Sequence, residues 1–175
     1  ETPEPARETR ALPGPFCNQA EASFGVSLPM RMKTPFTGGC VCGAVRYECS
    51  AIAAEIQMFK CHCRDCQHVT GGGHTPVVYV PAPTFKITRG ALRYYSTDSE
   101  MMGPHAHKRG FCAECGSRVT GGEGPGAPGI GMTAGSLDDP SWFKPTMDLW
   151  VCDAPPWDLM DPGLPKFKKL PEEQK

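Results

Sequence analysis

Short runs in which hydrophobic and polar residues alternate recur through the middle of the chain. In residues 43–50, Val45, Tyr47 and Cys49 fall on one side of an extended backbone and small or polar residues on the other, which is typical of a half-buried strand. Similar short runs, most of them bounded by Gly, Pro, Asp or Ser, occupy residues 56–60, 76–80, 84–88, 92–96, 107–111, 130–134 and 147–151. This spacing predicts a mainly β domain.

Helical periodicity is much weaker along the same sequence. No apolar stripe is longer than about two turns, and only residues 64–69 favour a single helical turn. Residues 1–33 are rich in Pro, Ala, Glu and Arg without sustained periodicity, so we interpret them as a flexible N-terminal extension. Residues 34–170 are then predicted to form a single domain, with residues 171–175 as a frayed tail.

Prolines interrupt the chain repeatedly after residue 151. We expect this segment to wrap the domain as an irregular arm anchored by Trp157, Leu159 and Phe167, because prolines break regular backbone pairing. We expect most of a group of four aromatic side chains to be buried in the core; the alternative is that they form the wall of a pocket. The four are Trp142, Phe143, Trp150 and Trp157.

Composition and charge narrow the possible partners and location. The chain has 175 residues, 39% of them hydrophobic, which suits one core. Its 18 basic and 19 acidic residues nearly cancel, so we expect neither nucleic acid nor an anionic membrane as a partner. No apolar run reaches the ~20 residues that cross a bilayer, and residues 1–30 lack the basic start and apolar stretch typical of an export signal. We therefore expect a cytoplasmic monomer or homodimer in a reducing compartment.

Seven of the ten cysteines fall in three tight groups. Clustered thiols in a reducing compartment hold metal more often than they form disulfides, and neither pair lies in the βαβ context of a thioredoxin-type redox motif. Of the other cysteines, Cys49 and Cys152 are expected as core thiols, and Cys17 belongs to the extension. The three groups are Cys40 with Cys42, Cys61 with Cys63 and Cys66, and Cys112 with Cys115.

Two of these groups can combine into one closed zinc site. Zn²⁺ binds four thiolates in a tetrahedron at about 2.3 Å. Cys112 and Cys115 supply half of the ligands, because two cysteines in this spacing can face one point across a tight turn. Cys40 and Cys42 supply the other half if the backbone bends at the two glycines before them.

The remaining group, Cys61, Cys63 and Cys66, offers three ligands and an open position. That arrangement is expected where a metal takes part in chemistry, since the open position admits water or substrate. The alternative is that His62 or a distant histidine closes the site and the metal only braces the fold. We prefer the open site, because a residue between two ligands in extended backbone points away from them.

The order of these motifs resembles the glutathione-dependent formaldehyde-activating enzyme family. The similarity spans about residues 35–167 and is carried by FTGGCVCGAVRY at 36–47, CHCRDC at 61–66, FCAECGS at 111–117, GSLDDPSWF at 135–143 and LPKF at 164–167. It implies an Mss4-like fold of small packed antiparallel sheets around two zinc ions, with few short helices. By the same resemblance, Cys40, Cys42, Cys112 and Cys115 hold a structural zinc, and Cys61, Cys63 and Cys66 hold the catalytic zinc.

The reaction that the resemblance implies joins glutathione and formaldehyde into S-(hydroxymethyl)glutathione, and a carbon–sulfur lyase runs it in reverse. Zinc deprotonates a bound thiol, and three thiolates make it a modest Lewis acid, so we favour delivery of a substrate thiolate over activation of the aldehyde. The two carboxylates of glutathione need basic partners, although each candidate could instead offset thiolate charge or be solvated. These candidates are Arg46, Arg64, Lys108 and Arg109.

Three histidines near the motifs are weaker candidates. His74 could act as a general acid, but a surface or hydrogen-bonded role is the preferred interpretation. His105 and His107 could form a further ligand pair, but we expect solvated strand residues. The alternative to an enzyme is a non-catalytic zinc scaffold for a protein or chromatin partner, because centromere protein V looks similar over this domain. The short extension of mixed charge weakens that alternative.

Overall fold

The computed structural model describes residues 32–97, 107–123 and 127–171. Within them the chain is mainly β, as the alternation predicts, with eleven strands in two sheets beside one α-helix, α1 (Arg64–Thr70). No helix in the described part of the chain is long and apolar enough to cross a bilayer. All but two residues of the predicted N-terminal extension, and the last four of the predicted tail, lie outside the described residues.

The smaller sheet has three antiparallel strands in the order β1 (Phe36–Gly39), β2 (Arg46–Cys49) and β5 (Phe85–Arg89). Strand β2 confirms the predicted alternation, since Tyr47 and Cys49 are buried while the residues between and before them are more exposed. One face of this sheet therefore packs inward and the other faces solvent.

The larger sheet has eight strands in the order β11-β10-β3-β4-β9-β8-β7-β6. It is antiparallel except where β10 pairs in parallel with β3 on one side and β11 on the other. The strands are β3 (Gln57–Cys61), β4 (Thr75–Pro81), β6 (Leu92–Thr97), β7 (His107–Cys112), β8 (Arg118–Glu123), β9 (Gly129–Thr133), β10 (Met147–Leu149) and β11 (Lys166–Phe167).

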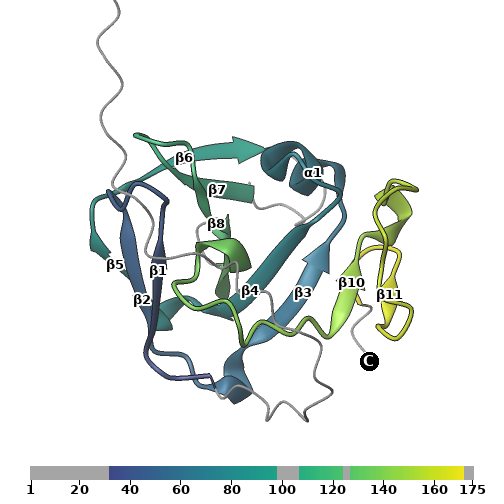
Figure 1. Cartoon of the computed structure of the whole chain (residues 1–175), viewed down its shortest axis with the longest axis horizontal. Coiled ribbons are helices and arrows are strands. Elements are labelled where there is room, and N and C mark those ends of the chain that lie inside the picture. The colour runs from purple at the N-terminus through teal and green to yellow at the C-terminus, as the bar shows by residue number, and fades with distance from the viewer. Residues whose placement is uncertain (1–31, 98–106, 124–126, 172–175) are drawn as a thin grey trace, which may run out of the picture.

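Strand β4 buries side chains on both faces of the larger sheet. Val78 and Val80 pack in the main core, which also contains side chains of the small sheet. Val77 and Tyr79 point the other way and pack around the cysteines that follow β3. The small sheet lies at one side of the molecule and β10 and β11 at the other (Figure 1). The larger sheet thus separates a closed core from a second, cysteine-lined face.

Seven of the eight predicted runs overlap strands as expected, and the run at 147–151 is shorter than predicted because β10 ends at Leu149. Three strands have no counterpart among the predictions. Strands β1 and β8 each contain two adjacent glycines, which weaken the strand signal, and β11 is only two residues long. The predicted helical turn at 64–69 is confirmed by α1.

The proposed anchors of the C-terminal arm were partly wrong. Trp157 is 65% exposed and Leu159 is 89% exposed, so neither side chain fixes the arm to the core. Backbone pairing fixes it instead, because Phe167 lies in β11 and the N–H of Asp148 donates to the carbonyl of Pro165. Side-chain hydrophobicity alone could not reveal this kind of attachment.

The expectation for the leftover cysteines was right for one residue and wrong for another. Cys49 is fully buried in β2, paired with Phe85 of β5, and so behaves as a core thiol. Cys152 is exposed, because it lies in a short 3₁₀ turn after β10 rather than in a strand. Cys17 lies outside the described residues.

Candidate metal centres

Two tight turns present the first four cysteines. Cys40 and Cys42 lie in the turn after β1, and Cys112 and Cys115 lie at the end of β7 and in the turn that follows. Each turn closes with a backbone hydrogen bond to the carbonyl of its first cysteine, at 3.0 Å from the N–H of Gly43 and at 2.9 Å from the N–H four residues after Cys112. Both donors are glycines with positive φ, which other residues rarely adopt. The two turns are therefore built alike.

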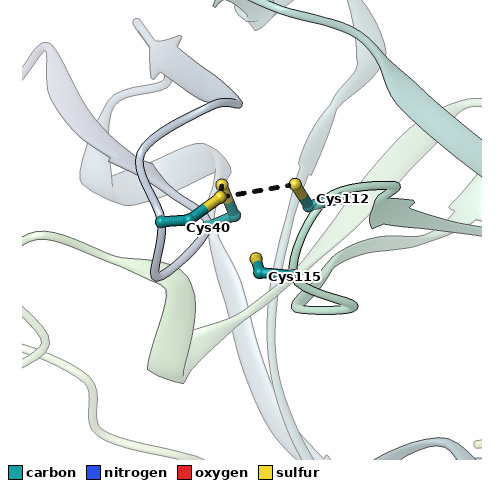
Figure 2. Close-up of side chains that lie close together, drawn as sticks. Cys40, Cys112 and Cys115 are labelled. Carbon is teal, nitrogen blue, oxygen red and sulfur yellow. Dashed lines mark hydrogen bonds between the residues drawn. The ribbon is translucent and has the colours of Figure 1, made fainter. Parts of the chain in front are cut away.

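The four sulfur atoms converge on one point. All lie within 4.8 Å of one another, with Sγ–Sγ distances of 3.5 Å for Cys40 and Cys42 and 3.8 Å for Cys42 and Cys112. Figure 2 shows Cys40, Cys112 and Cys115 pointing toward one another from the two turns. A tetrahedron with zinc–sulfur bonds of about 2.3 Å has edges of about 3.8 Å, whereas a disulfide needs about 2.05 Å. The spacing suits a metal and does not suit disulfides.

Local hydrogen bonds favour the thiolate at two of these four sulfurs, those of Cys115 and Cys40. Burial opposes ionisation of Cys115, but hydrogen bonds with the side chain and backbone of Ser117 lower the pKa of Cys115 to about 6. Burial likewise opposes ionisation of Cys40, but the N–H of Val45, 3.2 Å from its sulfur, helps to lower the pKa of Cys40. Deprotonated sulfur is the form that binds a metal ion.

The second group is positioned by the junction between β3 and α1. Cys61 ends β3, Cys63 is the residue that caps the N-terminus of α1, and Cys66 lies in its first turn. The cap is a hydrogen bond of 3.3 Å from the N–H of Cys66 to the sulfur of Cys63. All three are buried, and their sulfurs lie within 4.8 Å of one another. The structure thus brings the predicted trio together.

The three thiols share their protons unequally. Hydrogen bonds with Cys61 and Cys63 lower the pKa of Cys66 to about 2, and Arg118 adds to this effect through its positive charge. Hydrogen bonds with Cys63 and Cys66, together with burial, raise the pKa of Cys61. The trio therefore releases a proton readily at one sulfur, which prepares it for a cation.

A cavity of about 560 Å³ opens onto this trio. Cys61 and Cys66 form part of its wall, together with Arg118 and His107. Among the described residues no fourth His, Cys, Asp or Glu joins the trio within 4.8 Å. In the part of the chain that the structure covers, the trio thus has three candidate ligands and one open side.

His62, the candidate for closing the trio, points away from it into a polar cluster. Its Nε2 lies 3.1 Å from a carboxylate oxygen of Asp148, and its Nδ1 lies 2.8 Å from one of Asp158. His74 also binds Asp158, at 3.0 Å, which matches the hydrogen-bonded role preferred for it. The nitrogen and oxygen atoms of His62, His74 and Asp158 lie close enough to hold a cation, and hydrogen bonds already account for their spacing.

His107 is not the solvated strand residue that the sequence suggested. It lies on the inner side of the larger sheet, lines the cavity, and accepts a hydrogen bond of 2.9 Å from the N–H of Gly122 at Nε2. Burial, followed by the positive charges of Arg109 and Arg118, lowers the pKa of His107 to about 4. His107 is therefore neutral near pH 7, with its ring proton on Nδ1. His105 lies outside the described residues.

The basic residues suggested as partners for glutathione lie elsewhere. Arg46 pairs with Asp138, and Arg109 pairs with Asp65 at 3.0 Å. Arg64 bonds to residues of its own helix, and neither it nor Lys108 lines the cavity. The arginine that does line the cavity is one that the sequence reasoning missed.

That arginine, Arg118, begins β8 and donates a hydrogen bond of 3.0 Å from Nη1 to Thr75 Oγ1. It follows the Cys112–Cys115 motif by three residues, which was the available signal. Asp148 and Asp158 were also missed, since they lie more than 80 residues from the motif that they support. Nothing in their local sequence marks them.

Comparison with known proteins finds a matching family of sequences and a similar solved structure. A crystal structure of a Rhodobacter sphaeroides protein has 19% identity and a TM-score of 0.48, with 75% of this chain and 98% of that chain covered. The sequence model described as glutathione-dependent formaldehyde-activating enzyme matches residues 35–153, which hold all seven clustered cysteines. The chain belongs to the glutathione-dependent formaldehyde-activating enzyme family.

Proposed function

We propose that this protein is a zinc-dependent carbon–sulfur lyase that acts on a thiol–aldehyde adduct, in the manner of an S-(hydroxymethyl)glutathione synthase. The observation that carries the proposal is the contrast between the two cysteine groups. One is a closed set of four sulfurs, and the other is a set of three beside a cavity of about 560 Å³. A site that is only structural has no need of an open side.

Both groups fit zinc by their chemistry. Thiolates are soft ligands that select zinc over the harder divalent ions, and the sulfurs of each group converge within 4.8 Å. We assign the structural zinc to Cys40, Cys42, Cys112 and Cys115, and the catalytic zinc to Cys61, Cys63 and Cys66. When bound to the trio, zinc would supply positive charge that keeps a substrate thiol ionised at neutral pH.

The residues of the chain provide the rest of the site. Arg118 lies beside Cys66 and partly offsets the negative charge of the trio. The apolar wall of the cavity excludes water, which strengthens each electrostatic contact within it. In the synthetic direction the substrate sulfur bonds to the carbonyl carbon, the carbon–oxygen π bond breaks, and the oxygen takes the proton that the thiol released. The lyase direction reverses each of these changes.

The remaining features of the proposal concern the chain as a whole. Residues 34–170 form its single catalytic domain, which includes the family match at 35–153. The protein works in the cytoplasm as a monomer or homodimer, where a reducing environment keeps its clustered thiols available for metal. Its substrates are a small thiol and an aldehyde, with glutathione and formaldehyde as the first pair to test.

The test is the rate of adduct formation and breakdown in zinc-loaded protein. Exchange between formaldehyde and the adduct is followed by NMR with glutathione and with several other thiols, against the uncatalysed rate. We expect acceleration with at least one thiol, and none in a Cys63→Ser variant that keeps its fold. A zinc-loaded protein that accelerates exchange with none of the thiols is a scaffold and not a lyase.

A further inference from the structure

The wall of the cavity beside the trio is mainly apolar. Strands β3, β4, β9 and β10 supply most of it, and the segment after β11 completes the rim. Such a wall favours a ligand that leaves water, because each buried apolar group lowers the free energy of the complex. The larger apolar side chains are Phe59, Val77, Tyr79, Met147, Leu149, Trp150 and Leu170.

Charge is scarce on the same wall. Among the described residues that line the cavity, Arg118 is the one with a full charge, and no aspartate or glutamate lines it. Arg118 is already engaged, since it bonds to Thr75 and lies against the Cys66 sulfur. His107 is neutral for the reasons given above. The buried Nε of Arg118 has no hydrogen-bond partner in the described part of the chain, so the described wall offers a ligand one cation at most and no anion.

Glutathione fits this wall poorly. It carries two carboxylates and one ammonium group, and burying a charge without a partner is costly. The Nζ of Lys169 lies 5.6 Å from the centre of the Trp150 ring, and Lys169 is not among the lining residues. Arg46 and Arg109, which the sequence suggested for this task, are paired with Asp138 and Asp65.

We propose that the cavity binds a thiol with an uncharged, apolar body, whose sulfur lies at Cys61, Cys63 and Cys66 and whose body lies against β3, β4 and β10. This inference rests on the proposed function, because it names the substrate class of the same site. The preferred thiol is then not glutathione, which is a charged tripeptide. The aldehyde then adds to the sulfur at the inner end of the cavity.

The experiment measures binding to the zinc-loaded full chain by calorimetry and by tryptophan fluorescence, to which Trp150 contributes from the cavity wall. The probes are benzyl mercaptan, its charged analogue 4-(mercaptomethyl)benzoate, and glutathione. We expect benzyl mercaptan to bind roughly tenfold or more tightly than either charged thiol, because burying a carboxylate without a partner is costly. Equal or tighter binding of glutathione would overturn the inference.

Substitutions locate the binding in the cavity. Met147→Lys places a cation on the wall and should weaken benzyl mercaptan binding by roughly tenfold while strengthening that of the benzoate. Leu170→Lys, at the rim, should change the binding of both thiols in the same directions but by less. The leucine is 48% exposed, so a lysine fits there without disturbing the fold. Tyr95→Lys, at a residue that is 63% exposed and outside the cavity, is the matched control and should change nothing.

The two proposals fail in different ways. If all thiols bind equally and neither cavity lysine changes their order, the apolar assignment is wrong even if exchange with glutathione is accelerated. If benzyl mercaptan binds as expected but no thiol is accelerated, the cavity assignment stands and the lyase proposal is wrong. Zinc content and circular dichroism of every variant confirm that binding is compared between folded, loaded proteins.

Discussion

Removing the carboxylate of Asp148 should destabilise the protein strongly. Asp148 lies in β10 with no exposed surface, and one of its oxygens is 3.1 Å from Nε2 of His62 and 3.3 Å from Nζ of Lys60. His62 is equally buried, and the Lys60 side chain is only 13% exposed. Asp148→Ala would leave both donors without their shared acceptor, in a place that water reaches poorly.

The expected loss follows from this burial. Breaking a buried, paired charge by removing one partner costs about 3–5 kcal/mol. A domain of this size loses about 2–4 °C of melting temperature per kcal/mol, so the melting temperature should fall by about 6 to 20 °C. Asp148→Asn keeps the shape of the side chain and one acceptor oxygen, so its melting temperature should lie between those of the wild type and Asp148→Ala.

The assay is urea unfolding of zinc-loaded protein followed by circular dichroism, with zinc content measured for each variant. Glu48→Ala, at an exposed position in β2, is the matched loss of an acid and should change the free energy of unfolding by less than about 0.5 kcal/mol. If Asp148→Ala costs no more than Glu48→Ala, the polar cluster does not contribute to stability and the reasoning from burial fails.

The other predictions concern the two cysteine groups and one surface carboxylate. Cys115→Ser should lose the structural metal and unfold the domain, since a structural zinc contributes about 10–16 kcal/mol at pH 7. Cys63→Ser should stay folded, because serine also caps a helix, but with one zinc fewer and no activity. A similar loss of stability in both variants, measured by melting temperature and zinc content, would contradict this division. Burial opposes ionisation of Asp138, but hydrogen bonds from Arg46 and Thr37 lower the pKa of Asp138, so its contribution is present above the unfolded value near 3.9 and is lost as the pH falls below it. Asp138→Asn should therefore cost at most about 1 kcal/mol at pH 7 and less at pH 3, and an equal cost at both values in urea titrations would refute the assignment.

The fold could be predicted from the sequence where burial is local. Strand β2 alternates because one of its faces packs inward, and residues 46–49 carry that pattern in their own letters. Strand β1 could not be found this way, since half of it is glycine and its bridge from Gly38 reaches Leu137, far along the chain. Two adjacent glycines have no side chains, so they show no alternation of hydrophobic and polar positions.

The cysteine groups could be predicted because metal ligands keep a short spacing on a tight turn. The structure brings Cys40 and Cys42 to Cys112 and Cys115, as the spacing suggested. The residues that surround the trio could not be predicted in the same way. Arg118 reaches it only because β8 lies two strands from β4, with β9 between them. That placement is a property of the sheet order and not of any local motif.

The same sheet order explains why the two groups differ in access. The turns that carry the four-sulfur group face each other, so each pair supplies the two ligands that the other lacks. The trio has no opposing turn among the described residues; it faces the side chains of β4, β9 and β10 across the cavity. The rim of that cavity includes Leu170 and Pro171, which lie beyond the family match at 35–153. Membership in the family therefore accounts for the cysteines, whereas part of the wall that selects the thiol belongs to a segment which the family match does not cover.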